Sequence, residues 1–250
     1  MFHLFSSRPK ATQRLAEVPK GLRVYAIGDI HGRLDLLLTL HEKLVADARN
    51  RPDLDKRVIY LGDYIDRGPS SREVIETLRS VRPGGMPVTQ LQGNHEAMLL
   101  RFLEDFTIGP EWFNYGGLAT LMSYGVNPNG DGSATQDLQA VQRALFEKLP
   151  EAHRQFLINL PTHVEVGDYF FAHAGVRPGV PLDQQKASDL IWIRDEFLRS
   201  NEFHGRVIVH GHSFQSEPEV MANRIGIDTG AYATGRLTCL VLEGTDCRFL

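Results

Sequence analysis

The chain has 250 residues, of which 42% are hydrophobic, so it can bury a substantial core as one large domain or two small ones. Its 27 basic and 31 acidic residues give a net charge of -4, which excludes the overall basic field that recruits nucleic acid. Its two cysteines, Cys239 and Cys247, are too few for a disulfide framework, and we interpret them as reduced thiols of a cytoplasmic protein.

The first third of the chain repeats a strand followed by a helix. Strands are predicted at residues 23–28, 58–62 and 87–93, and helices at 33–49, 70–81 and 96–106. Ser70 and Glu73 form the sequence signature of a capping box at the start of the second helix. Three such units in a row predict a parallel sheet covered by helices, and therefore an α/β fold.

Residues 107–135 interrupt this pattern. They are rich in glycine, asparagine and aromatic residues, including Gly116-Gly117 and Asn129-Gly130-Asp131-Gly132, and are predicted to form a long loop. Helices are expected at 137–149 and 150–160, so that residues 107–160 form a cap or lid.

The remaining elements return to strands. We predict them at residues 164–172, 206–209, 223–227 and 237–242, with one helix at 189–199. Residues 1–20 lack the apolar stretch of a secretory signal and are expected to be an N-terminal extension. No apolar run approaches the roughly 20 residues that cross a bilayer, so no membrane partner is expected.

Five polar clusters each follow a predicted strand. They are Gly28-Asp29-Ile30-His31-Gly32, Gly62-Asp63-Tyr64-Ile65-Asp66-Arg67-Gly68, Gly93-Asn94-His95-Glu96, His173-Ala174-Gly175 and His210-Gly211-His212. Taken singly, each has an ordinary structural explanation: a helix cap, a surface turn, or a histidine bonded to backbone.

Taken together, the clusters predict one site. The carboxyl ends of strands in one sheet meet at one edge, which is where open α/β sheets bind ligands. Two aspartates, an asparagine and several histidines form a mixed oxygen and nitrogen donor set, which suits manganese, iron, zinc or magnesium better than calcium.

In these five blocks and their order, the chain resembles the PPP-type metallophosphatases of the calcineurin-like metallophosphoesterase superfamily, specifically their bacterial serine/threonine protein phosphatase branch. The resemblance spans residues 21–250 and implies a single catalytic domain. It implies an α/β sandwich of two mixed β-sheets flanked by helices, with a helical and loop cap insertion at about 107–160. It also implies two divalent metal ions, of which manganese is favoured over iron, zinc and magnesium.

The resemblance assigns six metal ligands, with Asp63 shared by both ions. They are Asp29, His31, Asp63, Asn94, His173 and His212. In the block His210-Gly211-His212 the family pattern favours His212, which leaves His210 as a supporting or structural residue.

The resemblance also assigns the groups that act on the substrate. His95 matches a general acid and Asp66 its orienting partner, while Arg67 matches a phosphate-binding arginine. Arg194 matches a second phosphate clamp, with a solvated helix arginine as the alternative, and Asn94 also lies at the substrate side.

The implied reaction is hydrolysis of phosphoserine and phosphothreonine in proteins, with phosphotyrosine as a further substrate, by direct attack of a hydroxide that bridges the two metals. A monomer whose partner is a phosphorylated protein is expected. One alternative is a hydrolase of diadenosine tetraphosphate and related dinucleoside polyphosphates, in which Trp112, Phe113 and Tyr115 stack a base. Another is a noncatalytic interaction module on the same fold.

Overall fold

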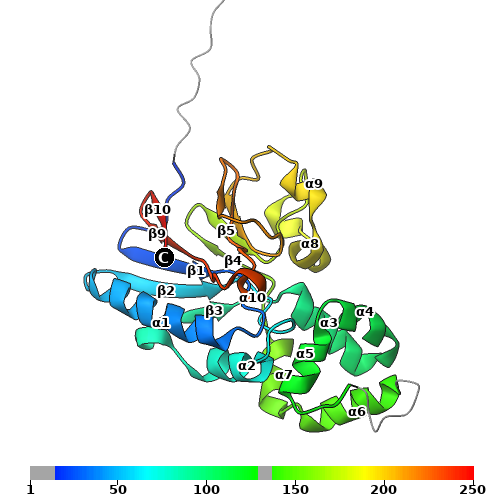
Figure 1. Ribbon diagram of the computed structural model, residues 1–250. Helices are drawn as coiled ribbons and strands as arrows, with labels where there is room; N and C mark the ends of the chain where they lie inside the picture. The colour runs from blue at the N-terminus through cyan, green and yellow to red at the C-terminus, as the bar shows by residue number, and fades with distance from the viewer. Residues whose placement is uncertain (1–14, 129–136) are drawn as a thin grey trace, which may run out of the picture.

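Two five-stranded β-sheets form the centre of the computed structural model, which describes residues 15–128 and 137–250 (Figure 1). The first sheet has the order β10-β9-β1-β2-β3 and the second β4-β5-β6-β8-β7. The strands of the first sheet are β1 (Leu22–Ile27), β2 (Asp55–Tyr60), β3 (Val88–Gln90), β9 (Cys239–Glu243) and β10 (Asp246–Phe249). Those of the second are β4 (His163–Val166), β5 (Tyr169–Ala172), β6 (Val207–His210), β7 (Glu219–Val220) and β8 (Arg224–Gly226).

Both sheets are mixed. Strands β1, β2 and β3 are parallel, whereas β9 and β10 pair antiparallel at the other side of β1. In the second sheet β5, β6 and β8 are parallel, and β4 and β7 are antiparallel edge strands. The predicted α/β fold with two mixed sheets is therefore confirmed.

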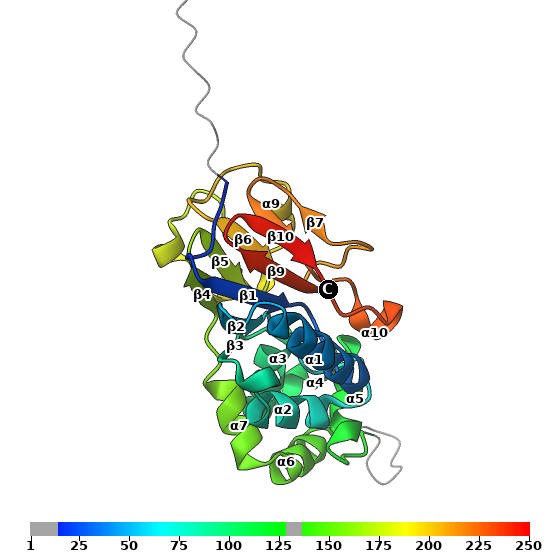
Figure 2. The ribbon, with the colours of Figure 1, turned by 90° about the vertical axis from the view of Figure 1, so that its left-hand side faces the viewer.

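Helices cover the outer faces of both sheets. Helices α1 to α7 lie below the sheets in Figure 1, while α8 and α9 lie at the upper right, and Figure 2 shows the lower layer from the side. The helices of the lower layer are α1 (Leu34–Arg49), α2 (Ser71–Ser80), α3 (Asn94–Glu104), α4 (Gly109–Asn114), α5 (Gly117–Ser123), α6 (Leu138–Lys148) and α7 (Glu151–Ile158). The others are α8 (Ala187–Trp192), α9 (Asp195–Leu198) and α10 (Ala231–Thr234), and three 3-10 turns are η1 (Pro83–Gly85), η2 (Phe106–Ile108) and η3 (Leu182–Gln184).

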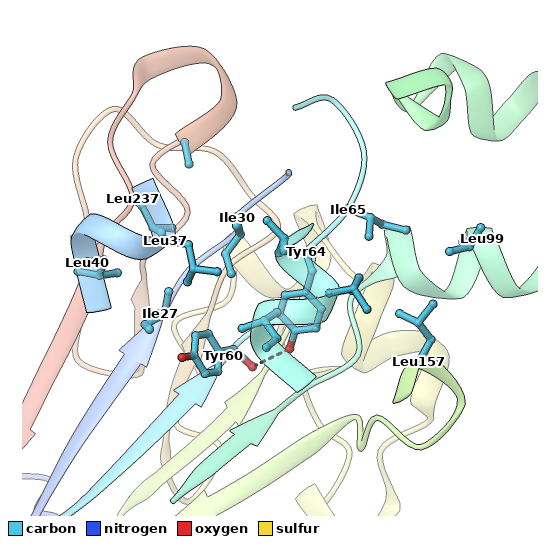
Figure 3. Packing of buried hydrophobic residues seen from close by; sticks show 14 of the residues in the cluster. Ile27, Ile30, Leu37, Leu40, Tyr60, Tyr64, Ile65, Leu99, Leu157 and Leu237 are labelled. Carbon is cyan, nitrogen blue, oxygen red and sulfur yellow. Dashed lines mark hydrogen bonds between the residues drawn. The ribbon is translucent and has the colours of Figure 1, made fainter. Parts of the chain in front are cut away.

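Three apolar clusters correspond to these layers. One lies between the sheets and contains Ala26, Leu61 and Phe171. A larger cluster joins the first sheet to α1, α2 and the helices that follow, and Figure 3 shows part of it around Tyr60 and Tyr64. A third joins the second sheet to α8 and α9. The site therefore rests on strands that are packed on both faces.

Four local predictions were wrong. Residues 107–128, predicted as loop, contain η2, α4 and α5; the predicted turn at residues 129–132 lies outside the described residues. Residues 164–172 form a hairpin rather than one strand, because Gly167 takes a φ of +59° between β4 and β5. The helix expected at 189–199 breaks at Arg194, whose φ and ψ of -134° and -100° are not helical. Helix α2 starts where predicted, but the Ser70 side chain makes no cap hydrogen bond.

Residues 15–20, the described part of the expected extension, pack against the sandwich. Val18 is buried, and its backbone N–H donates to the Gly244 carbonyl at 3.0 Å. Among the described residues, no helix is long and apolar enough to span a membrane.

Candidate metal centre

The predicted site residues come together where the two sheets meet. Asp29, Asp63 and Asn94 follow β1, β2 and β3 of the first sheet, while His173 and His212 follow β5 and β6 of the second. All five strands are parallel members of their sheets, so their carboxyl ends point to the same edge. These five side chains are all buried.

Three donor atoms lie close to the imidazole of His173, and we call these three residues and His173 the His173 group. Its Nε2 lies 2.9 Å from Asn94 Oδ1, 3.2 Å from His212 Nδ1 and 3.3 Å from Asp63 Oδ1. The four residues are those that the resemblance assigns to one metal ion. The donor atoms of Asp63, His173 and His212 lie within 4.8 Å of one another, close enough to bind one cation together.

The second oxygen of Asp63 faces a different set of donors, which we call the His31 group. Asp63 Oδ2 lies 3.6 Å from His31 Nε2 and 3.7 Å from His95 Nε2. Asp63 thus offers one oxygen to each group, an arrangement in which a carboxylate can bridge two cations. By distance alone, the third member of the His31 group is His95. The resemblance instead assigns Asp29 to the same ion as His31.

Asp29 lies beside these groups rather than within them. Its carboxylate accepts a hydrogen bond from the backbone N–H of His212 at 3.0 Å, so it links the first sheet to the second. Burial raises the pKa of Asp29, and the nearby Asp228 carboxylate raises it further.

Backbone carbonyls orient two of the imidazoles. The Nδ1–H of His31 donates to the Ile65 carbonyl at 2.8 Å, and that of His173 donates to the Leu61 carbonyl at 2.9 Å. With Nδ1 as the donor, Nε2 of each ring in its neutral form carries the lone pair that faces Asp63. This second layer of hydrogen bonds is typical of histidines that bind metals.

The electrostatics of the donors favour a cation between them. Burial alone would lower the pKa of His173, but the Asp63 carboxylate raises it to about 9. Burial also opposes ionisation of Asp63, yet His173 and His95 hold its pKa well below the usual range. Burial together with His173 lowers the pKa of His212 to about 2. The negative charge of Asp63 between the imidazoles therefore suits bound cations, and the mixed donor set fits two divalent metal ions.

His95 and Asp66 form a buried pair at the side of this centre. His95 Nδ1 donates to Asp66 Oδ2 at 2.7 Å. Burial lowers the pKa of His95, but the carboxylates of Asp63 and Asp66 outweigh it and raise the pKa overall. The pair therefore favours the protonated form of an imidazole whose Nε2 faces the metal groups.

Two guanidinium groups lie near the centre without a carboxylate partner among the described residues. Arg67 Nη2 is 3.4 Å from His95 Nε2, and its guanidinium lies 4.6 Å from the centre of the Tyr232 ring. Arg194 is exposed at the break between α8 and α9, close enough to lower the pKa of His212. His210 lies outside both groups, with its Nδ1–H on the Gly211 carbonyl and its ring against Phe197.

The backbone at the site is strained. Within the described residues, the non-glycine positions with left-handed φ are all in the predicted clusters: His31, Asp63, Asp66, Arg67 and His212. Such conformations are costly for L-residues and persist where packing and hydrogen bonds impose them, commonly at functional sites.

Sequence reasoning missed the role of Glu96. Its carboxylate accepts hydrogen bonds from the backbone N–H groups of Gly93, Asp63 and Tyr64 at 2.8 to 2.9 Å. The side chain therefore ties the loop that carries Asp63 to the start of α3. The only signal was the position of Glu96 in the first turn of a helix, which predicts a favourable dipole interaction and not this contact.

A family model described as calcineurin-like phosphoesterase matches residues 22–235. The chain belongs to this family. It is therefore a metal-dependent phosphoesterase, as the donor groups indicate.

Relatives within the family carry different names. The chain is 32% identical to serine/threonine-protein phosphatase 2 of Salmonella typhimurium, over 90% of this chain and 96% of the relative. It is 29% identical to a bis(5'-nucleosyl)-tetraphosphatase of Anoxybacillus flavithermus, over 86% of this chain and 88% of the relative.

Solved structures share the fold. A cold-active protein-tyrosine phosphatase of Shewanella matches with a TM-score of 0.54 at 17% identity, over 94% of this chain and 83% of that one. A metallophosphoesterase of Sphaerobacter thermophilus matches with a TM-score of 0.51 at 18% identity, over 92% and 87% of the two chains.

Proposed function

We propose that this phosphoesterase is a phosphoprotein phosphatase that hydrolyses phosphoserine and phosphothreonine, with phosphotyrosine as a further substrate. The observation that carries the proposal is the His95–Asp66 pair, buried next to the metal groups. A serine or threonine alkoxide leaves poorly unless it receives a proton, so a poised general acid suits an alkyl phosphate.

Each side chain has a task in this reaction. Two divalent cations, manganese being the pair we favour, supply Lewis acidity and activate water when bound. The guanidinium groups of Arg67 and Arg194 hold the nonbridging phosphate oxygens and stabilise their developing charge. His95 donates the proton of its Nε2 to the leaving oxygen, and Asp66 holds the imidazole in the orientation for that transfer.

The position of Arg67 supports this assignment. Its Nη2 lies 3.4 Å from His95 Nε2, so a phosphate held by Arg67 has its leaving oxygen within reach of the acid. Stacking on Tyr232 occupies the face of the guanidinium and leaves its edge for hydrogen bonds to phosphate.

The alternative, hydrolysis of a dinucleoside polyphosphate, is favoured by the relative named as a tetraphosphatase. Two observations weigh against it. A nucleotide leaves as a phosphate anion and needs less help from an acid than an alkoxide does. Of the three aromatics expected to stack a base, Trp112 is buried and Phe113 packs 5.8 Å from the Phe102 ring, so only Tyr115 is exposed.

The test compares two substrates with one enzyme preparation. The purified chain is loaded with manganese, and kcat/KM is measured for a phosphoserine peptide and for diadenosine tetraphosphate. The proposal predicts a higher kcat/KM for the phosphoserine peptide than for diadenosine tetraphosphate. The kcat/KM of a phosphotyrosine peptide, measured in the same series, shows where the third substrate stands relative to these two. A higher value for diadenosine tetraphosphate would contradict the proposal.

A further inference from the structure

The carboxylate of Asp66 has more partners than His95. Its Oδ2, which binds His95, also accepts a hydrogen bond from Trp112 Nε1–H at 2.9 Å. Its Oδ1 accepts from the hydroxyl of Thr120 at 2.6 Å. All four side chains are buried, with Asp66, Trp112 and Thr120 each 0% exposed. Asp66 is therefore held at both oxygens by residues that are distant in sequence.

Thr120 contacts Asp66 a second time. The backbone N–H of Asp66 donates to Thr120 Oγ1 at 2.9 Å, and the same hydroxyl gives its proton to the Asp66 carboxylate. The hydroxyl thus fixes the backbone and the side chain of one residue, at a position whose φ is +70°. This arrangement determines where the carboxylate points.

Trp112 and Thr120 come from α4 and α5, the helices of the insertion. Gly116, which precedes α5, and Gly117, its first residue, pack closely against neighbouring side chains. A Cβ on Gly117 would lie 2.5 Å from the indole of Trp112, and one on Gly116 would lie 2.8 Å from Arg67 Cγ. The Gly116 carbonyl also accepts the backbone N–H of Arg67 at 3.1 Å.

We propose that α4 and α5 position the acid of the reaction: Trp112 and Thr120 fix the Asp66 carboxylate and thereby aim His95 at the leaving group. The inference rests on the proposed role of His95 as proton donor. The insertion would then support the catalytic pair from the side away from the substrate, in addition to any contact that it makes with the substrate. Trp112 and Thr120 are positioning residues, because they reach the reacting atoms only through Asp66 and His95.

The physical reason is geometric. A carboxylate held by three hydrogen bonds keeps one orientation, and proton transfer requires the imidazole to stay within a narrow range of distance and angle. Without the indole N–H, His95 is the one remaining hydrogen-bond partner of Asp66 Oδ2 among the four side chains. The carboxylate then gains freedom to rotate. The effect should fall on the step that needs the proton.

The experiment measures how the loss depends on the leaving group. Trp112→Phe removes the N–H and retains an aromatic ring; its kcat is compared with wild type on a phosphoserine peptide, phenyl phosphate, 4-nitrophenyl phosphate and 2,4-dinitrophenyl phosphate. Because a positioned acid contributes about 10²- to 10⁴-fold, we expect a loss of about 10- to 100-fold on the peptide and phenyl phosphate. On the dinitrophenyl ester, whose leaving group needs no proton, kcat should change by less than about 3-fold. KM and bound metal should not change.

Two variants of Thr120 test the same inference without changing Trp112. Thr120→Val removes the hydroxyl and should show the same dependence on the leaving group, whereas Thr120→Ser retains the hydroxyl and should restore kcat. Asn114→Ala changes an exposed side chain on the same helix as Trp112, and should not show the dependence.

Two results would overturn the inference. One is an equal loss of kcat on all four esters, which would make Trp112 a residue of general structural importance. The other is no loss on any ester in both Trp112→Phe and Thr120→Val. A wild-type enzyme that hydrolyses the aryl esters but not the peptide would contradict the proposed function, while the aryl series would still test the positioning role.

Discussion

The metal groups and the His95–Asp66 pair are neighbours that are built differently. The donors of the metal groups follow strands of both sheets, and two of the imidazoles are oriented by backbone carbonyls at Leu61 and Ile65. The acid pair begins on the same loops, but side chains of the insertion, Trp112 and Thr120, hold it. On the proposed function, metal binding is thus a property of the sandwich, and proton transfer depends also on the insertion.

Asp63→Asn should have the largest effect, because Asp63 contributes an oxygen to each metal group. The amide cannot bridge two cations as a carboxylate does, so we expect no measurable turnover and a clear loss of bound metal. Metal analysis and kinetics on the same preparation measure both. Full metal content in the variant would show that Asp63 is not shared.

His95→Asn should lower kcat by about 10²- to 10⁴-fold, the usual contribution of a general acid, and leave bound metal unchanged. This variant separates the two regions, since it removes the acid and retains the ligands that the resemblance assigns. Asp63→Asn is its matched comparison. Equal metal loss in both variants would mean that His95 is a metal ligand and not the general acid.

Glu96→Gln tests the contact that connects the Asp63 loop to α3. The amide replaces one acceptor oxygen with a donor that faces backbone N–H groups, so an unsatisfied buried group should cost about 1 to 3 kcal/mol of unfolding free energy. Urea unfolding of the metal-free protein measures this, and metal titration should show weaker binding. Unchanged stability together with unchanged affinity would contradict the role of Glu96.

His41 lies outside both regions, on α1 against the Tyr60 hydroxyl, and should affect stability without affecting turnover. Burial lowers its pKa to about 4, so the unfolded chain binds the proton more readily than the folded one does. The stability that neutral His41 allows is fully present above the unfolded pKa of about 6.5 and is lost as the pH falls towards 4. The free energy of unfolding should therefore fall by about 2 kcal/mol between pH 7 and pH 5.

The measurement for His41 is urea unfolding at pH 7 and pH 5, with chelator present so that the metal groups do not contribute. His41→Gln is the control, because it has no proton to bind in this range. The wild type should lose more stability than the variant between the two pH values. An equal loss would assign the pH dependence to other groups.

The difference between the two regions also explains what the sequence could predict. The convergence of Asp63, His173 and His212 follows from donor residues placed directly after strands, since parallel strands end at one edge. Periodicity likewise predicted α1 to α3. These are local patterns whose consequence in space is fixed by the topology of the sheets.

The insertion could not be predicted in the same way. Gly116-Gly117 was interpreted as a loop signal, whereas the two glycines give room to Arg67 and to the indole of Trp112. Trp112 was assigned a role only in the dinucleotide alternative, as a residue that stacks a base, yet its indole N–H donates to Asp66, 46 residues away. Contacts of this kind depend on packing between distant segments, and no local pattern of residues records them.

The most direct test of the account is a crystal structure of the manganese-loaded protein with anomalous scattering recorded for manganese. Two ions about 3.5 to 4 Å apart are expected, with Asp63 between them, the His173 group on one ion, and Asp29 and His31 on the other. His95 Nε2 should point to the substrate side without binding either ion. A single ion, or an ion bound directly by His95, would contradict the division between metal centre and acid.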